Sequence, residues 1–191
     1  TIVVNQKVKA LTQLEEIYQY FSSIKVFSKV IPEVRTNISV AIPKPSSKND
    51  IAAIEGRITV IGGFPKACGG FKFGVSDHTA RILLTSKDYD PSINIVMNIK
   101  YRPAMVDKLQ QAHNFEVKEL VRGEQPEEVK KKEKSTMQWL IEECIKELGH
   151  IPDFIFDTGA PGKEPMIRIF ATNSNDMISK LGLILDFIDE E

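Results

Sequence analysis

The spacing of apolar residues predicts an amphipathic helix at each end of the chain. Near the N-terminus these residues lie mostly three or four positions apart, a spacing that lines one face of a helix. They are Val8, Leu11, Leu14, Ile17, Tyr18 and Phe21. A second segment with amphipathic character runs from Asp176 to Ile188. We therefore expect a helix with one buried face over each segment.

Between these helices the chain alternates between strand-like and helix-like segments. Apolar and β-branched runs predict strands at residues 37–42, 57–63, 92–99, 115–121, 151–157 and 166–171. The first two, separated by the turn-rich residues 43–50, are expected in one sheet. Three more helices are expected: one capped by Ser76 or Asp77 that buries Ile82 and Leu83, one from Pro103 through about His113, and one capped by Ser135 or Thr136 that ends at Leu148.

Alternating helices and strands are typical of an α/β domain with helices on both faces of a sheet. Residues 151–157 and 166–171 are neighbouring strands joined by a loop without a helix, which implies antiparallel pairing. We therefore predict a three-layer αβα sandwich with a mixed β-sheet. The charged segment 124–134 has no apolar periodicity and is interpreted as a solvated loop, with a charged interaction segment as the alternative.

Composition narrows the class of protein. The chain has 191 residues, 42% of them hydrophobic and 27% charged, which fits one globular domain and excludes a disordered or fibrous chain. Lys and Arg (25) balance Asp and Glu (26), so no basic excess drives sequence-independent binding to nucleic acid. No apolar run approaches the ~20 residues that cross a bilayer. We expect neither nucleic-acid binding nor membrane insertion.

Cysteine usage indicates a reducing compartment. Cys68 and Cys144 lie far apart and have neither the spacing of a zinc site nor that of a disulfide framework. We therefore expect a cytoplasmic protein. The chain begins with Thr1 rather than Met, from which we expect a fragment of a longer polypeptide.

The first candidate anion site is the glycine-rich segment GGFKFGVSDH, residues 69–78. Its glycines allow a ligand close to the backbone, and the N–H groups of the following helix would donate to a phosphate. His78 would lie in the first turn of that helix. The alternative, which the spacing alone favours, is a capping turn with a solvated histidine.

The second candidate is the segment DTGAPGKEP, residues 157–165. It places Asp157 at a strand end and Lys163 in a glycine-containing loop, where the ammonium could meet a phosphate. The spacing is not that of a P-loop, because Glu164 follows the lysine where Ser or Thr is required. A plain turn between two strands is the alternative.

The third candidate groups polar residues near strand ends. Arg35 and Asn37 precede one predicted strand and Arg57 opens the next. A guanidinium can hold a phosphate through parallel N–H bonds, so Arg35 and Arg57 would clamp an anion if they converge. Asn98 and Lys100 lie at the end of a buried strand, a usual place for ligand groups in α/β sheets. Salt bridges and a solvated strand end are the alternatives.

Six motifs, taken in order, resemble the ThiN-type thiamine-phosphate synthase family: PEVRTNI, GRITV, FGVSDHTAR, DPSINIVMNIKY, STMQW and GKEPMIRI. The resemblance covers about Ile31 to the C-terminus. It implies a single ThiN-like domain over residues 1–191, with 1–30 as an N-terminal helical extension and 31–191 as the family core. The segment KACGGFKFG departs from the proline-rich approach usual in that family, which leaves the shape of this loop open.

The resemblance also implies an AraD-aldolase-like fold and a transferase reaction. In that family hydroxymethylpyrimidine diphosphate is condensed with hydroxyethylthiazole phosphate, which gives thiamine phosphate and pyrophosphate. Mg²⁺ usually accompanies such diphosphate chemistry. The domain is often the C-terminal part of a fusion with a hydroxymethylpyrimidine-phosphate kinase, and the sequence is compatible with a homo-oligomer.

Two catalytic positions of the family match Arg57, in the GRI motif, and His78, before the TAR run. A non-catalytic branch, regulators that sense thiamine phosphates, lacks this pair, so the pair favours an enzyme over a ligand-sensing domain. We hypothesise that Arg57, together with Lys163 and Arg35, clamps the diphosphate and that His78 donates to a phosphate or moves a proton on the aminopyrimidine. The candidates for binding substrate or phosphate are Arg35, Asn37, Lys100, Ser135, Asp157 and Lys163.

Other reaction classes find less support in the sequence. The chain has no G-x-S-x-G, no H-E-x-x-H and no G-x-G-x-x-G before a helix. An aldolase-like lyase would need a cluster of zinc ligands, which three scattered histidines do not supply. His113 and His150 are interpreted as structural, and Cys68 has no base nearby in the sequence that would make it a nucleophile.

Overall fold

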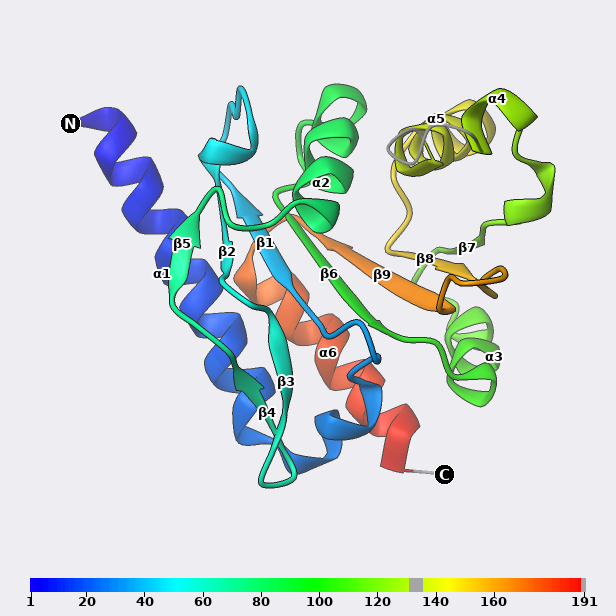
Figure 1. The fold of residues 1–191 in the computed structure, drawn as a ribbon, viewed down its shortest axis with the longest axis horizontal. Coiled ribbons are helices and arrows are strands. Elements are labelled where there is room, and N and C mark those ends of the chain that lie inside the picture. Colours follow the sequence, from blue (N-terminus) through cyan, green and yellow to red (C-terminus); the bar gives the residue numbers. More distant parts are fainter. Residues whose placement is uncertain (131–135, 190–191) are drawn as a thin grey trace.

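The computed structural model describes residues 1–130 and 136–189 and has a seven-stranded sheet at its centre (Figure 1). In chain order the strands are β1 (Ile38–Ala41), β2 (Ile51–Ile54), β5 (Phe71–Phe73), β6 (Ile95–Lys100), β7 (Val117–Glu119), β8 (Phe154–Asp157) and β9 (Met166–Ala171). Their order across the sheet is β5-β2-β1-β6-β9-β8-β7, and every neighbouring pair is antiparallel except the parallel pair β7 and β8. The predicted mixed sheet is confirmed, as is the antiparallel pairing of β8 with β9.

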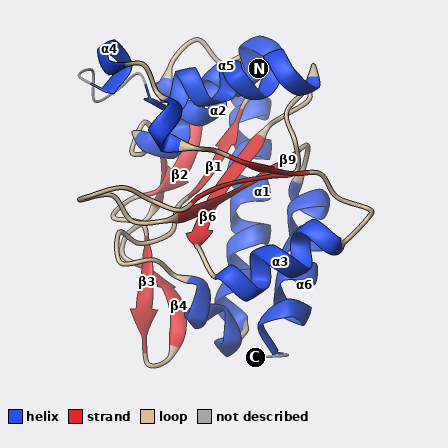
Figure 2. Cartoon of the chain, turned by 90° about the vertical axis from the view of Figure 1, so that its right-hand side faces the viewer, coloured by secondary structure: helices blue, strands red, loops and turns tan. Residues whose placement is uncertain are grey.

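Helices cover both faces of this sheet. They are α1 (Ile2–Ser23), α2 (His78–Tyr89), α3 (Pro103–Gln111), α4 (Glu127–Lys130), α5 (Thr136–Leu148) and α6 (Ser174–Asp189), with short 3₁₀ turns η1 (Lys25–Val30), η2 (Lys48–Asp50) and η3 (Arg122–Glu124). Side chains of α1, α3 and α6 pack in one hydrophobic core, and those of α2 and α5 pack in a second. Figure 2 shows α2 and α5 above the sheet and α3 and α6 below it. The predicted three-layer αβα sandwich is confirmed.

The N-terminal helix α1 belongs to the main core. Leu14, Ile17 and Phe21 are fully buried because their helical spacing places them on the face that α1 turns toward β1, β2 and α6. Val8, which the sequence analysis placed on the buried face, lies on the opposite face and is exposed, so that part of the prediction is wrong. Residues of this helix and of the sheet therefore share one set of buried contacts. In the described ranges no helix is both long and apolar enough to cross a membrane.

One predicted strand lies outside the central sheet. β3 (Ile58–Ile61) pairs with β4 (Phe64–Ala67) in a separate two-stranded hairpin, on which Val60 and Ile61 stay exposed. The prediction that residues 57–63 join β1 in one sheet is therefore wrong. β2 takes that place instead: its sequence IAAI is buried on both faces, so it lacks the polar alternation that marks a half-buried strand.

Helix α2 begins where the sequence predicts, but its start is held differently. Asp77 occupies the N-cap position, yet its carboxylate makes no capping bond and instead pairs with Arg81 one turn later (2.6 Å). Ser76 Oγ shares a hydrogen bond with Thr79 Oγ1 (2.7 Å). The first N–H groups of α2 are therefore not bonded to either predicted cap side chain.

The segment before α5 is described only in part. α5 starts at Thr136 and ends at Leu148, as predicted. Ser135, the other predicted cap and a substrate-binding candidate, lies outside the described residues. In the segment predicted as a charged loop, residues 127–130 form the short helix α4, and residues 131–134 also lie outside the described residues.

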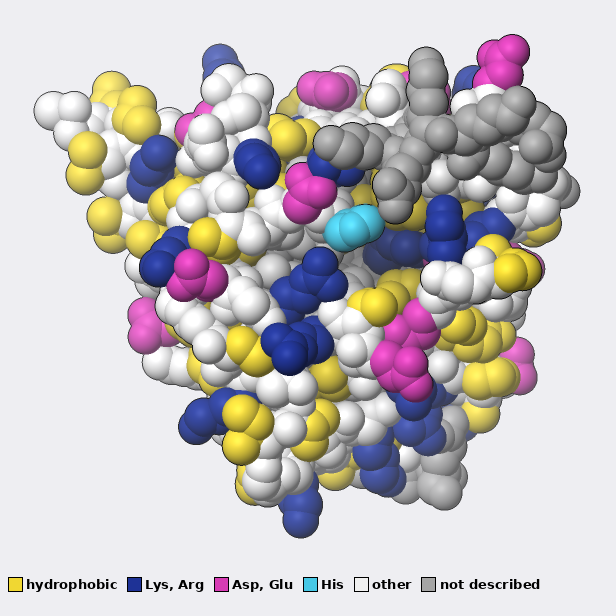
Figure 3. Space-filling view, in the orientation of Figure 1, with side chains coloured by type: hydrophobic (Ala, Val, Ile, Leu, Met, Phe, Trp, Pro, Cys, Tyr) yellow, Lys and Arg dark blue, Asp and Glu magenta, His cyan; other side chains and the backbone are white. Residues whose placement is uncertain are grey.

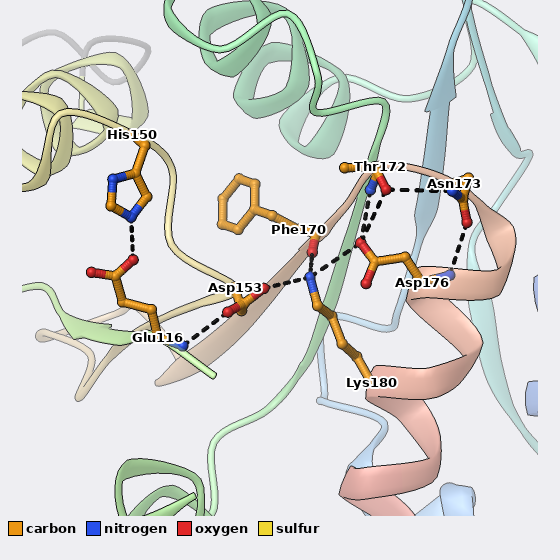
Figure 4. A network of polar contacts seen from close by, with 8 residues as sticks. All are labelled: Glu116, His150, Asp153, Phe170, Thr172, Asn173, Asp176 and Lys180. Carbon is orange, nitrogen blue, oxygen red and sulfur yellow. Dashed lines mark hydrogen bonds and ion pairs between the residues drawn. The ribbon is translucent and has the colours of Figure 1, made fainter. Parts of the chain in front are cut away.

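A buried lysine joins α6 to the sheet near the start of β8 and the end of β9 (Figure 4). The Lys180 ammonium donates a hydrogen bond to the Phe170 carbonyl (2.6 Å) and pairs with Asp153 (2.7 Å) and Asp176 (3.3 Å). Asp153 also accepts a hydrogen bond from the backbone N–H of Glu116, which precedes β7 (2.8 Å). Because a buried ammonium is costly unless it is paired, these partners fix the position of α6 against β8 and β9.

Candidate active site

A cavity of about 330 Å³ lies between the sheet and helices α2 and α5. Among the described residues, its wall carries five basic side chains from separate parts of the chain: Arg57, His78, Arg122, Lys163 and Arg168. Figure 3 shows lysine and arginine side chains around a histidine and a hollow on this face of the molecule. The structure thus brings four of the predicted site residues together, namely Asn37, Arg57, His78 and Lys163, and adds two arginines that the sequence analysis missed.

Strand alternation explains why polar side chains meet on this face. Val96 and Phe170 belong to the core under α2 and α5, so residues two positions away on the same strands, Asn98 and Arg168, face the same side. Asn98 and Arg168 are paired in register across β6 and β9. The polar end of this sheet face therefore becomes the floor of the cavity.

Arg57 lies in the turn between β2 and β3, in the left-handed backbone region (φ 66°), and so does Arg35 (φ 71°). The two residues brace one another. One guanidinium nitrogen of Arg57 donates to the carbonyl of Val34 (2.8 Å), and one of Arg35 donates to the carbonyl of Gly56 (3.1 Å). Each side chain thus holds the residue that precedes the other arginine, which fixes both turns.

Arg35 is not brought into the cavity, contrary to the hypothesis that it clamps the diphosphate with Arg57. Its guanidinium points to the β3–β4 hairpin, where it contacts the Gly56 carbonyl and the Cys68 sulfur (3.4 Å). Because this side chain is engaged with the hairpin, Arg35 positions the Arg57 turn rather than lining the cavity. Arg35 and Arg57 therefore do lie close together, as predicted, but their contacts stabilise the two turns instead of forming a clamp for an anion.

His78 is the first residue of α2 and lines the cavity. His78 is exposed, but its partial desolvation at the cavity wall lowers the pKa of its imidazole below the ordinary 6.5, and the positive charge of Arg57 lowers it further, while Asp77 opposes this shift. The imidazole is therefore neutral at pH 7. A neutral imidazole offers one N–H donor and one acceptor nitrogen, so it can hold a ligand oxygen or take up a proton.

Asn37 and Lys100, two further predicted binding residues, lie respectively in the cavity wall and outside it. Asn37 lines the cavity, but its side chain is bonded to both the N–H (3.0 Å) and the carbonyl (3.1 Å) of Ile54, which locks β1 to β2. Lys100 is exposed at the end of β6 and is not part of the cavity wall. The prediction that a cation after this strand faces the ligand is not met, because the strand ends beyond the cavity.

Asp157 does not face a phosphate but holds two arginines. Its buried carboxylate accepts from Arg122 Nε (2.7 Å) and from one terminal nitrogen of Arg168 (2.8 Å). Burial alone would raise the pKa of the Asp157 carboxyl, but the two guanidinium groups hold it below its ordinary value. The carboxylate therefore stays charged and orients Arg122 and Arg168, both of which line the cavity.

Lys163 is carried by the loop between β8 and β9. Gly159 in this loop has φ 81°, and a Cβ there would lie 2.7 Å from the Lys163 carbonyl, so glycine is required. The Glu164 carboxylate accepts hydrogen bonds from the backbone N–H groups of Glu33 (2.9 Å) and Val34 (3.1 Å), which ties the loop to the turn before β1. Lys163 is exposed at the cavity mouth.

The described residues do not form a site for Mg²⁺. Residues 1–130 and 136–189 contain no group of three or more His, Cys, Asp or Glu side chains placed to hold a metal ion. Glu164 lines the cavity, and each of its two carboxylate oxygens accepts one backbone N–H. Asp157, which holds two of the cavity's arginines, accepts four hydrogen bonds and does not offer the hard oxygen ligand that Mg²⁺ prefers.

Comparisons with known proteins agree on most of the chain. The family model described as thiamine-phosphate synthase ThiN matches residues 13–182. The thiamine-phosphate synthase ThiN of Methanothermobacter thermautotrophicus is 33% identical over 149 residues, which are 78% of this chain and 78% of that protein. The bifunctional thiamine biosynthesis protein ThiDN of Methanocaldococcus jannaschii is 36% identical over 169 residues, which are 87% of this chain but 39% of that longer protein.

Solved structures show the same relationships. The C-terminal domain of a phosphomethylpyrimidine kinase superposes with a TM-score of 0.87 at 36% identity, covering 93% of this chain and 99% of that domain. An aldolase II superfamily protein from Pseudomonas syringae has a TM-score of 0.51 at 7% identity, covering 95% of this chain and 75% of that protein. The second likeness concerns the fold alone, and it confirms the expected aldolase-like architecture.

Proposed function

Because this chain belongs to the ThiN family of thiamine-phosphate synthases, we propose that it condenses hydroxymethylpyrimidine diphosphate with hydroxyethylthiazole phosphate. The products are thiamine phosphate and pyrophosphate. One observation carries the proposal: Arg57, Arg122, Lys163 and Arg168 share one cavity with His78. Both substrates and both products are phosphorylated, and such a basic cavity suits them.

The proposed reaction is an alkyl transfer from oxygen to nitrogen. The bond between the pyrimidine methylene carbon and the diphosphate oxygen breaks, and its electron pair leaves with the diphosphate. The thiazole nitrogen supplies the electron pair of the new carbon–nitrogen bond. Negative charge thus grows on the leaving group, and cations fixed in advance around it lower the barrier.

Arg57 and Lys163 are the proposed contacts to the leaving diphosphate. Arg57 is held by Val34 and by the brace to Arg35, so its guanidinium needs little reorganisation when charge develops. Lys163 adds a mobile ammonium at the cavity mouth. His78, being neutral, is proposed to bind a substrate oxygen or to exchange a proton with the aminopyrimidine.

Mg²⁺ remains a prediction, and no proposed step depends on it. The described carboxylates do not form a magnesium site. An ion bound mainly by substrate phosphates and water, as is common for Mg²⁺, would need few ligands from the protein.

We also propose that the chain works as one part of a longer protein with a kinase domain and in the cytoplasm. The support is that the ThiDN relative is described as bifunctional and is longer than this chain. The two cysteines are unpaired, Cys68 exposed and Cys144 buried, which is compatible with a reducing compartment. The predicted homo-oligomer stays a prediction.

The test is to mix both substrates with the chain and to measure thiamine phosphate and pyrophosphate. We expect product from the wild type and a loss of about 100-fold or more in kcat for Arg57→Met and His78→Gln, as for other fixed groups that stabilise a transition state. Lys100→Ala is the matched control, because Lys100 lies outside the cavity. Tight binding of thiamine phosphate without any turnover would instead favour a ligand-sensing domain.

A further inference from the structure

We propose that Arg122 and Arg168, held by Asp157, form a phosphoryl-binding subsite in the buried part of the cavity. This inference rests on the proposed function, since it asks where that reaction's phosphorylated groups bind. Arg122 and Arg168 are the least exposed of the cavity's cations: their side chains are 11% and 9% exposed. His78, Arg57 and Lys163 occupy the more open part of the wall.

Three elements bring the subsite together. Asp157 ends β8, Arg168 lies in the middle of β9, and Arg122 opens the turn η3 after β7. Strands β7 and β9 flank β8 on its two sides, so both arginines reach the same carboxylate from opposite sides.

All hydrogen-bond acceptor positions of the Asp157 carboxylate are occupied, whereas the guanidinium groups of Arg122 and Arg168 still have N–H donors to offer. Asp157 Oδ1 accepts from Arg122 Nε (2.7 Å) and from the N–H of Gly159 (2.9 Å), and Oδ2 accepts from Arg168 (2.8 Å) and Arg122 (3.2 Å). These bonds fill the acceptor positions of the carboxylate. Each guanidinium keeps further N–H groups with no acceptor among the described residues, and both arginines line the cavity.

The charge of the cluster is unbalanced. Among the described residues, one carboxylate faces two guanidinium groups, so this part of the cluster carries a net positive charge. Uncompensated charge in a buried place is unfavourable, and an anion from the cavity would remove the imbalance. A phosphoryl group fits because its several oxygens can accept parallel N–H bonds from two planar guanidinium groups.

A purely structural cluster would be built differently. Lys180 illustrates such a case: its ammonium is surrounded by Asp153, Asp176 and the Phe170 carbonyl, with no excess of positive charge. At Asp157 the ratio is reversed, and the spare donors border a cavity. Its excess positive charge and its N–H donors at the cavity therefore suit the cluster to bind an anion.

Two sources of a phosphoryl group exist in the proposed reaction, the diphosphate of the pyrimidine and the phosphate of the thiazole. The test starts with equilibrium titration of the whole chain by calorimetry, using inorganic pyrophosphate and inorganic phosphate as probes. We expect Arg122→Gln and Arg168→Lys to weaken binding of at least one probe by about 10- to 100-fold, the range for hydrogen bonds to charged groups. Lys100→Ala should bind both probes like the wild type. Wild-type-like binding of both probes by the two arginine variants would overturn the proposal.

Thermal unfolding of each variant guards against loss of the fold. If Arg168→Lys does not fold, Arg122→Gln decides alone, because Arg122 sits on the short turn η3 rather than inside a strand. A probe titration needs no turnover, so its result is independent of the synthase assay. Product formation by the wild type with unchanged binding in folded Arg122→Gln would reject the subsite and keep the function. If Arg122→Gln loses probe binding but the wild type forms no product, the subsite is supported and the proposed synthase function is rejected.

Steady-state kinetics then identify the bound group. A rise in KM for the thiazole phosphate alone assigns the subsite to that substrate. A rise for the pyrimidine diphosphate alone assigns it to the leaving group. Unchanged KM and kcat for both substrates in Arg122→Gln would contradict the subsite.

Discussion

At the scale of single residues, the conformations of Arg35 and Arg57 are informative. Both have a positive φ, 71° and 66°, where a side chain crowds the backbone and glycine is preferred. Such strain costs of order 1–3 kcal/mol and persists only where the surroundings enforce it. Here the reciprocal bonds to the carbonyls of Val34 and Gly56 enforce it. The strain is thus concentrated at the turn that delivers Arg57 to the cavity.

The first prediction concerns this brace. Arg35→Ala removes the bond to the Gly56 carbonyl, so the Arg57 turn should loosen and kcat should fall about tenfold, the effect of one charged hydrogen bond. The NMR-detected pKa of His78 should rise toward 6.5, because Arg57 helps to lower it. Lys66→Ala, an exposed change on the same hairpin, serves as the control. An unaltered His78 titration in Arg35→Ala would show that the brace does not position Arg57.

The second prediction concerns pH. Since partial desolvation and Arg57 lower the pKa of His78, the imidazole charges only when the pH falls below the ordinary 6.5. If catalysis needs neutral His78, kcat/KM should decline on the acid side with a midpoint below 6.5. Arg57→Met should move that midpoint upward, and the shift is measured on the residual activity. A midpoint that stays in place in Arg57→Met would mean that another group controls the acid limb.

The third prediction concerns the Asp157 cluster. The pKa of Asp157 is lower in the folded chain than in the unfolded chain, so its stabilising effect is present above the ordinary value of 3.8 and is lost as the pH falls through the folded value. Asp157→Asn should cost about 3–5 kcal/mol of unfolding free energy at pH 7, because two buried guanidinium groups lose their partner. The difference from wild type should narrow below pH 3.8. Urea denaturation at several pH values checks this, and a difference that is constant with pH would argue against the ion pairs.

Individual site residues differ in how visible they are in the sequence. Arg57, His78 and Lys163 stand in short motifs with glycine or a helix start beside them, so local reasoning finds them. Arg122 and Arg168 are joined to Asp157 across 35 and 11 positions, and only the strand order shows that they meet. One signal was available: Arg168 is a cation inside an otherwise apolar run whose positions are all buried. Such a residue needs a buried partner.

At the scale of elements, periodicity predicts helices better than it predicts strand partners. The pattern around Leu14 and Phe21 is local and is confirmed as α1. Residues 57–63 have a strand pattern, but nothing in it shows that they form a hairpin outside the sheet. Pairing depends on segments far apart in the chain, and for this reason β2, which the sequence analysis did not predict, takes the place beside β1 that was expected for residues 57–63.

The fourth prediction tests whether α1 is part of the folding unit. Phe21 is fully buried and stacks near Phe27 with ring centroids 4.9 Å apart, so Phe21→Ala should cost about 3–5 kcal/mol. Val8→Ala, on the exposed face of the same helix, should change stability by less than about 0.5 kcal/mol. Denaturant unfolding measures both. A small effect of Phe21→Ala would mean that α1 is a dispensable extension.

At the scale of the whole molecule, the cavity depends on the layered arrangement rather than on any one motif. One wall comes from α2 and α5, the floor from the central strands, and the rim from the loops around Arg57 and Lys163. The expected fold class follows from alternating elements, and the synthase assignment follows from motifs in order. The shape of the cavity follows from neither, because it is set by which strands are adjacent.

The position of β9 between β6 and β8 has a consequence for biosynthesis. β9 is made after every other described strand of the sheet, and until it is added β6 and β8 each expose an unpaired edge. Glu164 likewise binds backbone groups 131 and 130 positions earlier. Contacts between residues so far apart in the sequence slow folding and prolong the lifetime of aggregation-prone folding intermediates. A nascent chain should therefore gain its ligand-binding ability abruptly and late, and shortened translation products should aggregate rather than bind.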